Sequence, residues 1–241
     1  MIERFHFKEI SSTNDYAKEL IKDKSLIAVS ADFQLSGRGR NSKVWEGEAF
    51  KNIYLSFAIN HKNHKPYQFP SRYQALGALL VFNVLSKYIS ENNIRIKYPN
   101  DIYLMDNGFK KVSGILIEHS IHGKNAEYSI IGIGINISQN KFSDEIRNNT
   151  TSLNNLGFEV NLNTIYDQLI LEFEKLIFKS ELEIFIDWRE KLNIINKNVF
   201  QIGRNRYAYI KHINDDCSLL AFDENNFEIR VDNGDSIRYE L

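Results

Sequence analysis

The sequence is poor in cysteine and proline: its 241 residues include one cysteine, Cys217, and three prolines. A single cysteine excludes an intramolecular disulfide and fits a reducing compartment. The chain also has no apolar run long enough to span a bilayer, and its start lacks the basic-then-apolar layout of a secretion signal. The sequence therefore predicts a cytoplasmic protein that does not bind a membrane.

Neither sign of charge is in excess, because 30 Lys and Arg residues face 31 Asp and Glu residues. A net charge of -1 provides no global positive field, so we expect no nucleic-acid partner and only local cationic sites. The hydrophobic fraction of 43% is ordinary for a globular protein. A chain of 241 residues can form one large domain or a domain with a small appendage.

Helical and strand-like patterns are mixed in the first 195 residues. We expect helices at residues 13–21, 68–91, 164–179 and 181–193. Strands are expected at residues 26–31, 52–57, 94–97, 101–105, 110–120 and 126–138, with hairpins at 106–108 and around 122–124. This mixture predicts an α+β domain.

The pattern changes at about Asn196. Short alternating runs at residues 198–202, 206–213, 218–222, 227–231 and 236–239 are separated by Asn, Asp and Gly turns. We therefore expect two domains, residues 1–195 and a small all-β domain at residues 196–241.

A glycine-spaced pair of arginines lies between the strands expected at 26–31 and 52–57. Gly37 and Gly39 let the backbone approach a ligand closely, and Arg38 and Arg40 carry cationic forks suited to phosphate or carboxylate. Taken alone, this loop fits an anion site and a solvated basic turn about equally well.

The strand near residue 134 has two very different faces. Odd positions from 131 to 137 are all Ile, whereas the even positions are Gly132, Gly134, Asn136 and Ser138. Because side chains alternate across a strand, one face is apolar and the other is nearly bare backbone with polar groups. A helix packed on the glycines is one interpretation, but the polar residues favour a ligand.

The turn before the strand at 101–105 contains Pro99, which fixes its own φ and favours an extended Tyr98. Asn100 and Asp101 are thereby presented at a defined bend, where they could hold a metal ion or a ligand amine. An ordinary turn is an equally good interpretation.

Two pairs of histidines have a spacing of three: His61 with His64, and His119 with His122. Because no Cys or acidic partner completes a zinc pattern, we interpret them as solvent-exposed. The chain also lacks the G-x-x-x-x-G-K-[ST] pattern of a P-loop.

Six segments, in order and spacing, resemble the biotin-protein ligases (biotin–[acetyl-CoA-carboxylase] ligases). They are residues 12–14, 34–40 with Trp45, 52–56, 97–101, 111–118 and 132–136. The resemblance implies the biotin/lipoate ligase catalytic fold, a mixed or antiparallel sheet flanked by helices, followed by a small SH3-like β-barrel.

The resemblance implies two reaction steps. Biotin and ATP give biotinyl-5'-AMP and pyrophosphate, and a lysine of a biotin carboxyl carrier protein or domain then attacks the mixed anhydride. Because an anion attacks an anion first, the protein must screen charge and position the groups. Mg²⁺ would enter with ATP rather than on a protein cluster, with Asn100 as the nearest candidate contact.

The resemblance also assigns roles to residues. The expected catalytic residues are Arg40, Lys111 and Asp101, with Asp101 orienting the lysine amine. The expected biotin-binding residues are Ser12, Thr13, Asn14, Gln34, Gly37, Arg38, Gly114, Gly132 and Gly134. The expected nucleotide-binding residues are Arg38, Arg40, Lys43, Trp45, Asn100, Lys111 and Asn136.

The sequence departs from the family pattern at two places. Ser42 and Lys43 stand where the family usually has Gly and Arg, and Tyr98 stands where it commonly has Trp. The first motif begins at Ser11, which predicts the enzyme-only form without the DNA-binding domain of repressing members. Homodimerisation, known among those members, stays open for this chain.

Two alternatives remain. A lipoate or octanoate ligase or transferase shares the catalytic fold but generally lacks the Gly-Arg loop and the Pro-Asn-Asp turn. A degenerate, biotin-binding sensor would also fit the changes at residues 41–43, although Arg38, Arg40 and Lys111 argue for phosphate chemistry.

Overall fold

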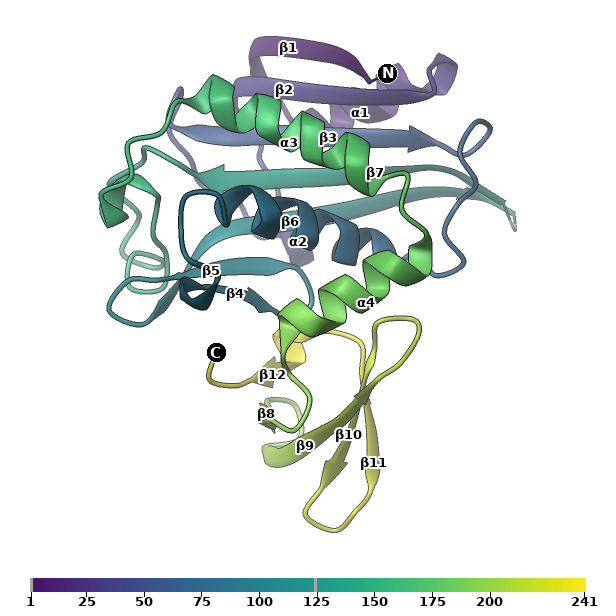
Figure 1. Cartoon of the computed structure of the whole chain (residues 1–241), viewed down its shortest axis with the longest axis vertical. Coiled ribbons are helices and arrows are strands. Elements are labelled where there is room, and N and C mark those ends of the chain that lie inside the picture. Colours follow the sequence, from purple (N-terminus) through teal and green to yellow (C-terminus); the bar gives the residue numbers. More distant parts are fainter. Residues whose placement is uncertain (1, 124) are drawn as a thin grey trace.

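The computed structural model describes residues 2–123 and 125–241. In these ranges the strands form a seven-stranded sheet, in the order β1-β2-β3-β7-β6-β5-β4, and a five-stranded sheet, in the order β11-β10-β9-β8-β12. Figure 1 shows the larger sheet crossed by helices, with the smaller sheet below it. β1 and β2 pair in parallel and the other neighbours of the large sheet pair antiparallel, so the predicted α+β class with a mixed sheet is confirmed.

The elements are joined by connections of different length, and the two longest between strands and α-helices are residues 35–51 and 137–161. The large sheet contains β1 (Glu3–Ile10), β2 (Leu26–Gln34), β3 (Asn52–Asn60), β4 (Ile94–Lys97), β5 (Asp101–Met105), β6 (Phe109–His122) and β7 (Asn125–Asn136). The α-helices are α1 (Thr13–Leu20), α2 (Arg72–Leu85), α3 (Leu162–Leu176) and α4 (Glu181–Leu192). The small sheet contains β8 (Asn198–Gln201), β9 (Arg206–Ile213), β10 (Leu219–Asp223), β11 (Glu228–Val231) and β12 (Ile237–Arg238).

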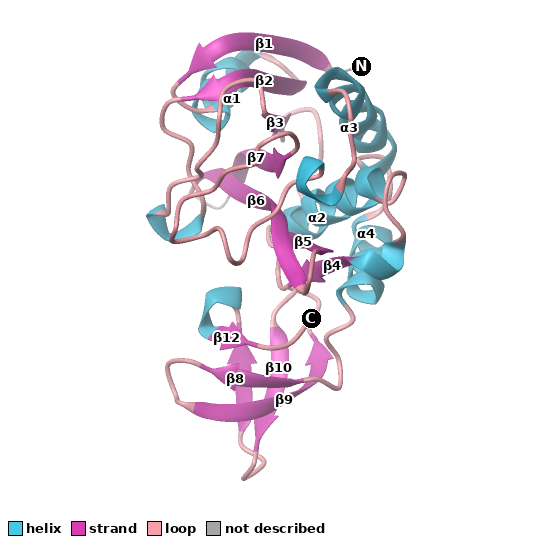
Figure 2. Ribbon diagram, turned by 90° about the vertical axis from the view of Figure 1, so that its left-hand side faces the viewer, coloured by secondary structure: helices cyan, strands magenta, loops and turns pink. Residues whose placement is uncertain are grey.

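The two faces of the large sheet are covered differently. α2, α3 and α4 lie on one face, where Phe57 of β3 stacks on Phe173 of α3 with ring centroids 3.9 Å apart. Gly77 lets α2 approach closely, since a Cβ there would lie 2.8 Å from Cγ2 of Ile115. α1 packs on the opposite face, mainly against β2 and β3 (Figure 2). The opposite face is therefore only partly covered by a helix.

The C-terminal sheet packs against the turn that joins β4 and β5. In this turn the Tyr98–Pro99 peptide bond is cis. The Tyr98 amide donates to the Tyr239 hydroxyl at 2.7 Å, and the Tyr98 hydroxyl donates to the Val231 carbonyl at 3.1 Å. One buried apolar cluster includes residues of both sheets. β8 begins close to the predicted change at Asn196, and the division into two domains stays a prediction.

Two elements differ from the expectation. The sequence analysis does not include β1, in which exposed polar residues alternate with Phe5 and Phe7 over residues 4–8 only. The two rings pack, partly buried, against the core cluster under α1. The helix predicted at 68–91 is too long at both ends. Pro70 disfavours helix at the residue before it, and the amides of Gln68 and Phe69 donate to the Glu181 carboxylate instead.

The interpretation of all four histidines as solvent-exposed is wrong for three of them, since His61, His64 and His119 are partly buried and only His122 is exposed. His61 and His119 are far apart in the sequence but close together in the fold, where both are half-buried. Each has a ring nitrogen 2.8 Å from the Ser129 hydroxyl. The hairpin predicted around 122–124 joins β6 and β7, but Lys124 lies outside the described residues. Within the described ranges, no helix is long and apolar enough to cross a membrane.

Candidate active site

A cavity of about 230 Å³ lies on the sheet face that carries α1. It is bounded by the start of α1, by residues 36–45 and by residues 196–241. Residues 36–45 are here called the Gly-Arg loop, and residues 196–241 the C-terminal module. The predicted site residues that line it are Ser12, Thr13, Asn14, Gln34, Arg38, Arg40, Lys43, Trp45, Asp101, Lys111, Gly114, Gly132, Gly134 and Asn136. Gly37 and Asn100 are buried and do not line it.

The floor of the cavity is the paired backbone of β6 and β7. Gly114 lies directly opposite Gly134 in register, and Gly132 lies on the same face two residues away. The Ile side chains between these positions on β7 belong to the core under α2, as the alternation predicts. A Cβ on Gly132 would lie 2.3 Å from Oδ1 of Asn14, so the floor has no room for a side chain there. Ser138 lies beyond the end of β7 and does not line the cavity.

The indole of Trp45 lies on this floor. A Cβ on Gly134 would lie 2.5 Å from Cε2 of the indole, and a Cβ on Gly114 would lie 2.9 Å from Cζ3. Lys111 Nζ is 5.8 Å from the ring centroid, within range of a cation–π contact. The indole fills part of the cavity, and the space left is smaller than the roughly 300–1,000 Å³ common for ligand pockets.

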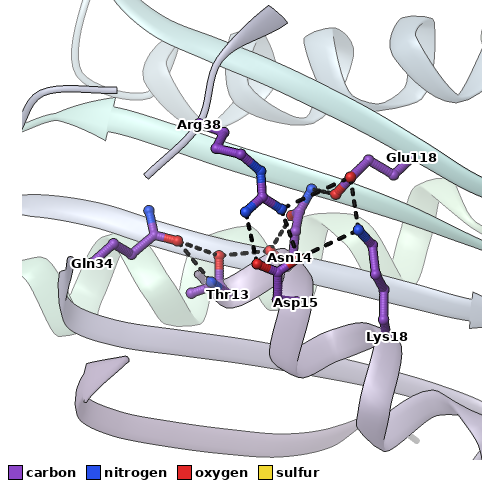
Figure 3. A network of polar contacts seen from close by, with 8 residues as sticks. Thr13, Asn14, Asp15, Lys18, Gln34, Arg38 and Glu118 are labelled. Atoms are coloured by element: carbon purple, nitrogen blue, oxygen red, sulfur yellow. Dashed lines mark hydrogen bonds and ion pairs between the residues drawn. The ribbon is translucent and has the colours of Figure 1, made fainter. Parts of the chain in front are cut away.

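A chain of hydrogen bonds orients the polar side chains at the start of α1 (Figure 3). Gln34 Oε1 accepts from the Thr13 amide at 2.7 Å. The Ser56 hydroxyl lies 2.7 Å from Thr13 Oγ1 and donates to Asn14 Oδ1 at 2.6 Å, while Asn14 Nδ2 donates to Glu118 Oε2 at 2.6 Å. Because Ser56 is fully buried, it fixes the two residues without lining the cavity.

The guanidinium of Arg38 is held by a carboxylate of the same network (Figure 3). Its NH1 donates to Asp15 Oδ2 at 2.7 Å and its NH2 donates to Asp15 Oδ1 at 2.6 Å. The hydrogen bond from Arg38 is the largest cause that lowers the pKa of Asp15. Lys18 Nζ lies 2.8 Å from Glu118 Oε1 and 3.4 Å from Asp15 Oδ1. Two cations and two carboxylates therefore balance at this end of the cavity.

The tip of the Gly-Arg loop contacts the C-terminal module. Arg40 NH2 donates to Asn233 Oδ1 at 2.5 Å. Asp235 accepts from Asn41 Nδ2 at 2.7 Å, and its other oxygen lies 3.6 Å from Lys43 Nζ. Asp235 also lines the cavity, so the C-terminal module supplies part of the wall.

The turn after β4 presents Asp101 to the cavity and buries Asn100. Asp101 Oδ2 lies 2.7 Å from Lys111 Nζ, so two of the predicted catalytic residues form an ion pair. The side-chain Nδ2 of Asn100 donates to the Ile115 carbonyl, and Oδ1 of Asn100 accepts from Arg40 NH1 at 3.3 Å. Asn100, which is buried, thus holds the Arg40 guanidinium in place through this hydrogen bond.

Comparison with known proteins identifies the family. Residues 6–136, more than half of the chain, match the Biotin/lipoate A/B protein ligase family. The chain belongs to this family.

Individual relatives cover more of the chain than the family match. The chain is 30% identical over 214 residues to the bifunctional ligase/repressor BirA of Escherichia coli, a match that covers 81% of this chain and 64% of that protein. It is 26% identical over 220 residues to the biotin–[acetyl-CoA-carboxylase] ligase of Mycobacterium tuberculosis, covering 88% and 78%. The chain therefore spans less than two thirds of the length of the E. coli relative.

A solved structure extends the likeness to the whole fold. The biotin protein ligase from Aquifex aeolicus in complex with biotin and ATP superposes with a TM-score of 0.79 at 23% identity, and the match covers all of both chains. The implied fold, a ligase sheet followed by an SH3-like module, is thereby confirmed.

Several residues at the site of this family member are missed by motif reasoning. Four of them form hydrogen bonds that orient predicted residues: Asp15, Lys18, Ser56 and Glu118. Of these, only Ser56 and Glu118 lie within the motif segments. Phe142, Ile146, Thr150 and Asp235 also line the cavity. They come from the loop after β7 and from the C-terminal module, where no local pattern signals a ligand.

A magnesium ion held by the protein does not fit this site. In the part of the chain that the structure describes, no group of three or more His, Cys, Asp or Glu residues could hold a metal ion. Both polar atoms of the Asn100 side chain are engaged by Ile115 and Arg40. Asn100 is buried by these contacts and does not line the cavity, so its side chain does not face a ligand there.

Proposed function

We propose that this protein is a biotin-protein ligase, which forms biotinyl-5'-AMP from biotin and ATP and transfers biotin to a lysine of a carboxylase carrier domain. The observation that carries the proposal is the glycine floor of β6 and β7, which lies between the polar wall of α1 and the cations of the Gly-Arg loop. An uncharged ring fits the floor and wall, and phosphates fit the cations. Family membership and the names of the relatives support the same reaction.

The ring of biotin is placed against the start of α1. Thr13, Asn14 and Gln34 offer hydroxyl and amide groups that match the ureido N–H and C=O groups. Gly132 leaves room for the Asn14 side chain to lie directly on the strand. Because Ser56 and Glu118 already orient Asn14, little ordering is left for the ligand to impose.

In the first step an oxygen of the biotin carboxylate attacks the α-phosphorus of ATP, and pyrophosphate leaves with the electron pair of the broken P–O bond. Arg40, which is bound by the neutral side chains of Asn100 and Asn233, supplies most of the positive charge that this encounter of anions needs, and Lys111 adds to it beside Asp101. Arg38 contributes less net charge, because Asp15 already binds its guanidinium at two points. ATP enters with Mg²⁺ on its phosphates.

In the second step the lysine amine of the carrier attacks the carbonyl carbon of the mixed anhydride. The new amide bond forms as the bond between the carbonyl carbon and the AMP oxygen breaks, AMP leaves with the electron pair, and the nitrogen releases a proton to solvent. Asp101 accepts a hydrogen bond from the amine and orients it, since its carboxylate lines the cavity and keeps 28% of its side-chain surface exposed. We place the reaction in the cytoplasm, where the free thiol of Cys217 stays reduced.

ATP–pyrophosphate exchange on the purified chain, with biotin and lipoate compared side by side in MgATP, tests the proposal. Exchange that depends on biotin supports the adenylating step, and transfer is then followed on a recombinant carrier domain. Exchange with lipoate alone assigns the chain to the lipoate branch of the family. Biotin binding without exchange identifies a sensor.

A further inference from the structure

Resting on the proposed function, we infer that Asp15 is a positioning residue that holds the Gly-Arg loop over the cavity through Arg38 before substrate binds. Asp15 belongs to none of the predicted sets of site residues and does not line the cavity. It lies one residue after Asn14 on α1, so the helix that presents the ring-binding groups also anchors the loop.

The Gly-Arg loop has little internal support. A single β-bridge joins Arg38 to Val44, and the amides of Gly39 and Trp45 donate to the carbonyls of Lys43 and Gly37 at 2.7 and 2.9 Å. Such a short hairpin is marginal alone and needs anchors on its neighbours. Outside the loop, the Ser36 amide donates to the Ser11 carbonyl at 2.9 Å, and the rest of the loop depends on side-chain contacts with its neighbours.

The loop has anchors at both ends, and the contact with Asp15 has the better geometry. Asp15 binds Arg38 through both carboxylate oxygens, a fork-to-fork arrangement that fixes direction as well as distance. At the tip, Arg40 donates single hydrogen bonds to the side-chain oxygens of Asn233 at 2.5 Å and Asn100 at 3.3 Å, and Asn41 donates to Asp235 at 2.7 Å. The contact with Asp15 is thus the bidentate ion pair of the loop, and it anchors the loop to α1, whereas the tip is anchored to the C-terminal module.

The surroundings keep Asp15 in place. Lys18 lies one helical turn after it and also binds Glu118, which in turn binds Asn14. Opening of the stem therefore disturbs the same network that orients Asn14 for the ring. This connection predicts that the loss of Asp15 weakens biotin binding more than it slows the chemical step.

Limited trypsin digestion of the complete, ligand-free chain reports loop opening, because Arg40 and Lys43 are cleavage sites within the loop. We expect Asp15→Asn to speed cleavage at these sites about three- to fivefold, the upper range for a half-exposed ion pair. Asp15→Glu keeps the charge and restores slow cleavage. The matched control is Asp187→Asn, because Asp187 on α4 forms an ion pair with Lys179 at 2.7 Å. The Asp187 side chain is 40% exposed, and that of Asp15 is 38% exposed.

A double-mutant cycle separates positioning from general destabilisation. If Asp15 acts through Arg38, Asp15→Asn adds no further cleavage in an Arg38→Gln chain. Equal cleavage of the wild type and Asp15→Asn, or an undiminished effect in the Arg38→Gln chain, overturns the inference. Neither readout needs a substrate, so it stands apart from the proposed function.

The exchange assay then tests the link to substrate. We expect the KM for biotin to rise by about the same factor in Asp15→Asn, with kcat nearly unchanged and Asp15→Glu close to wild type. Faster cleavage with an unchanged KM contradicts the link between the loop anchor and binding. Absence of exchange in the wild type contradicts the proposed function and leaves digestion to decide on the anchor.

Discussion

Adjacent residues of β7 face environments with opposite requirements. Ile131 is fully buried beneath α2, where a close-packed core needs its volume. Gly132 lies on the cavity side, where a Cβ would collide with Asn14. On the face of Ile131, therefore, a smaller side chain lowers the stability of the fold. On the face of Gly132, a larger side chain weakens ligand binding. Changes on the two faces should separate activity from stability.

The largest effect is expected on the cavity side from Arg40→Ala. Its guanidinium is held by Asn100 and Asn233 toward the place where the phosphates are proposed to lie. Loss of one such group typically costs roughly 10²–10³ in rate. Exchange and retention of biotinyl-5'-AMP measure the effect, and an unchanged thermal midpoint shows that the fold survives.

Arg4→Ala is the control for Arg40→Ala, because Arg4 is an exposed cation of β1 paired with Asp167. It should leave exchange as in the wild type. Unchanged exchange together with unchanged leakage of the adenylate in Arg40→Ala would contradict the role of Arg40.

The next effect is expected from Gly132→Ala on the floor. The new methyl group must displace Asn14, which Ser56 and Glu118 hold by hydrogen bonds, and a shift of about 1 Å can cost roughly 10²-fold in activity. The KM for biotin in exchange measures it. Gly203→Ala is the control, since a Cβ there meets nothing within 4 Å. Wild-type kinetics in Gly132→Ala would show that the floor does not bind the ring.

On the helix-covered face, Ile131→Val should change stability alone. Removing one buried methylene costs about 0.5–1.5 kcal/mol. Urea unfolding measures the loss, and the KM for biotin should stay at the wild-type value. A raised KM without a loss of stability would reverse the assignment of the two faces.

The smallest effect concerns pH and the histidines at the edge of that face. Burial is the largest cause that lowers the pKa of both His61 and His119 below the ordinary value. A lowered pKa in the folded state means that the unfolded chain binds more protons, so this contribution is complete above about pH 6.5 and is lost as pH falls below it.

Urea unfolding midpoints between about pH 7.5 and 5.5 test this expectation. We expect the double variant His61→Asn/His119→Asn to lose less stability over this range than the wild type. His212→Gln, on an exposed position of β9, should follow the wild type. If the double variant and the wild type lose equal stability over this pH range, the two half-buried imidazoles are not the source of the loss.

Local pattern was sufficient for much of the fold and of the cavity. Alternation along residues 131–137 separated the core face from the floor, since the side-chain period of a strand is a local property. Glycine and arginine spacing located the Gly-Arg loop, and Asn, Asp and Gly turns located the C-terminal strands. The edge strand β1 was missed because its alternation of Phe5 and Phe7 with exposed polar residues covers only residues 4–8.

By itself, the sequence determined the class of fold, the glycine floor and most of the residues around the cavity, because periodicity and motif order are encoded over short stretches. Tertiary structure alone decided that Asp15 binds Arg38, that Ser56 and Glu118 orient Asn14, and that Asp235 closes the wall. Each of these contacts joins residues more than 20 positions apart or on different elements. They depend on strand register and on the docking of the C-terminal module, and no local spacing encodes either one.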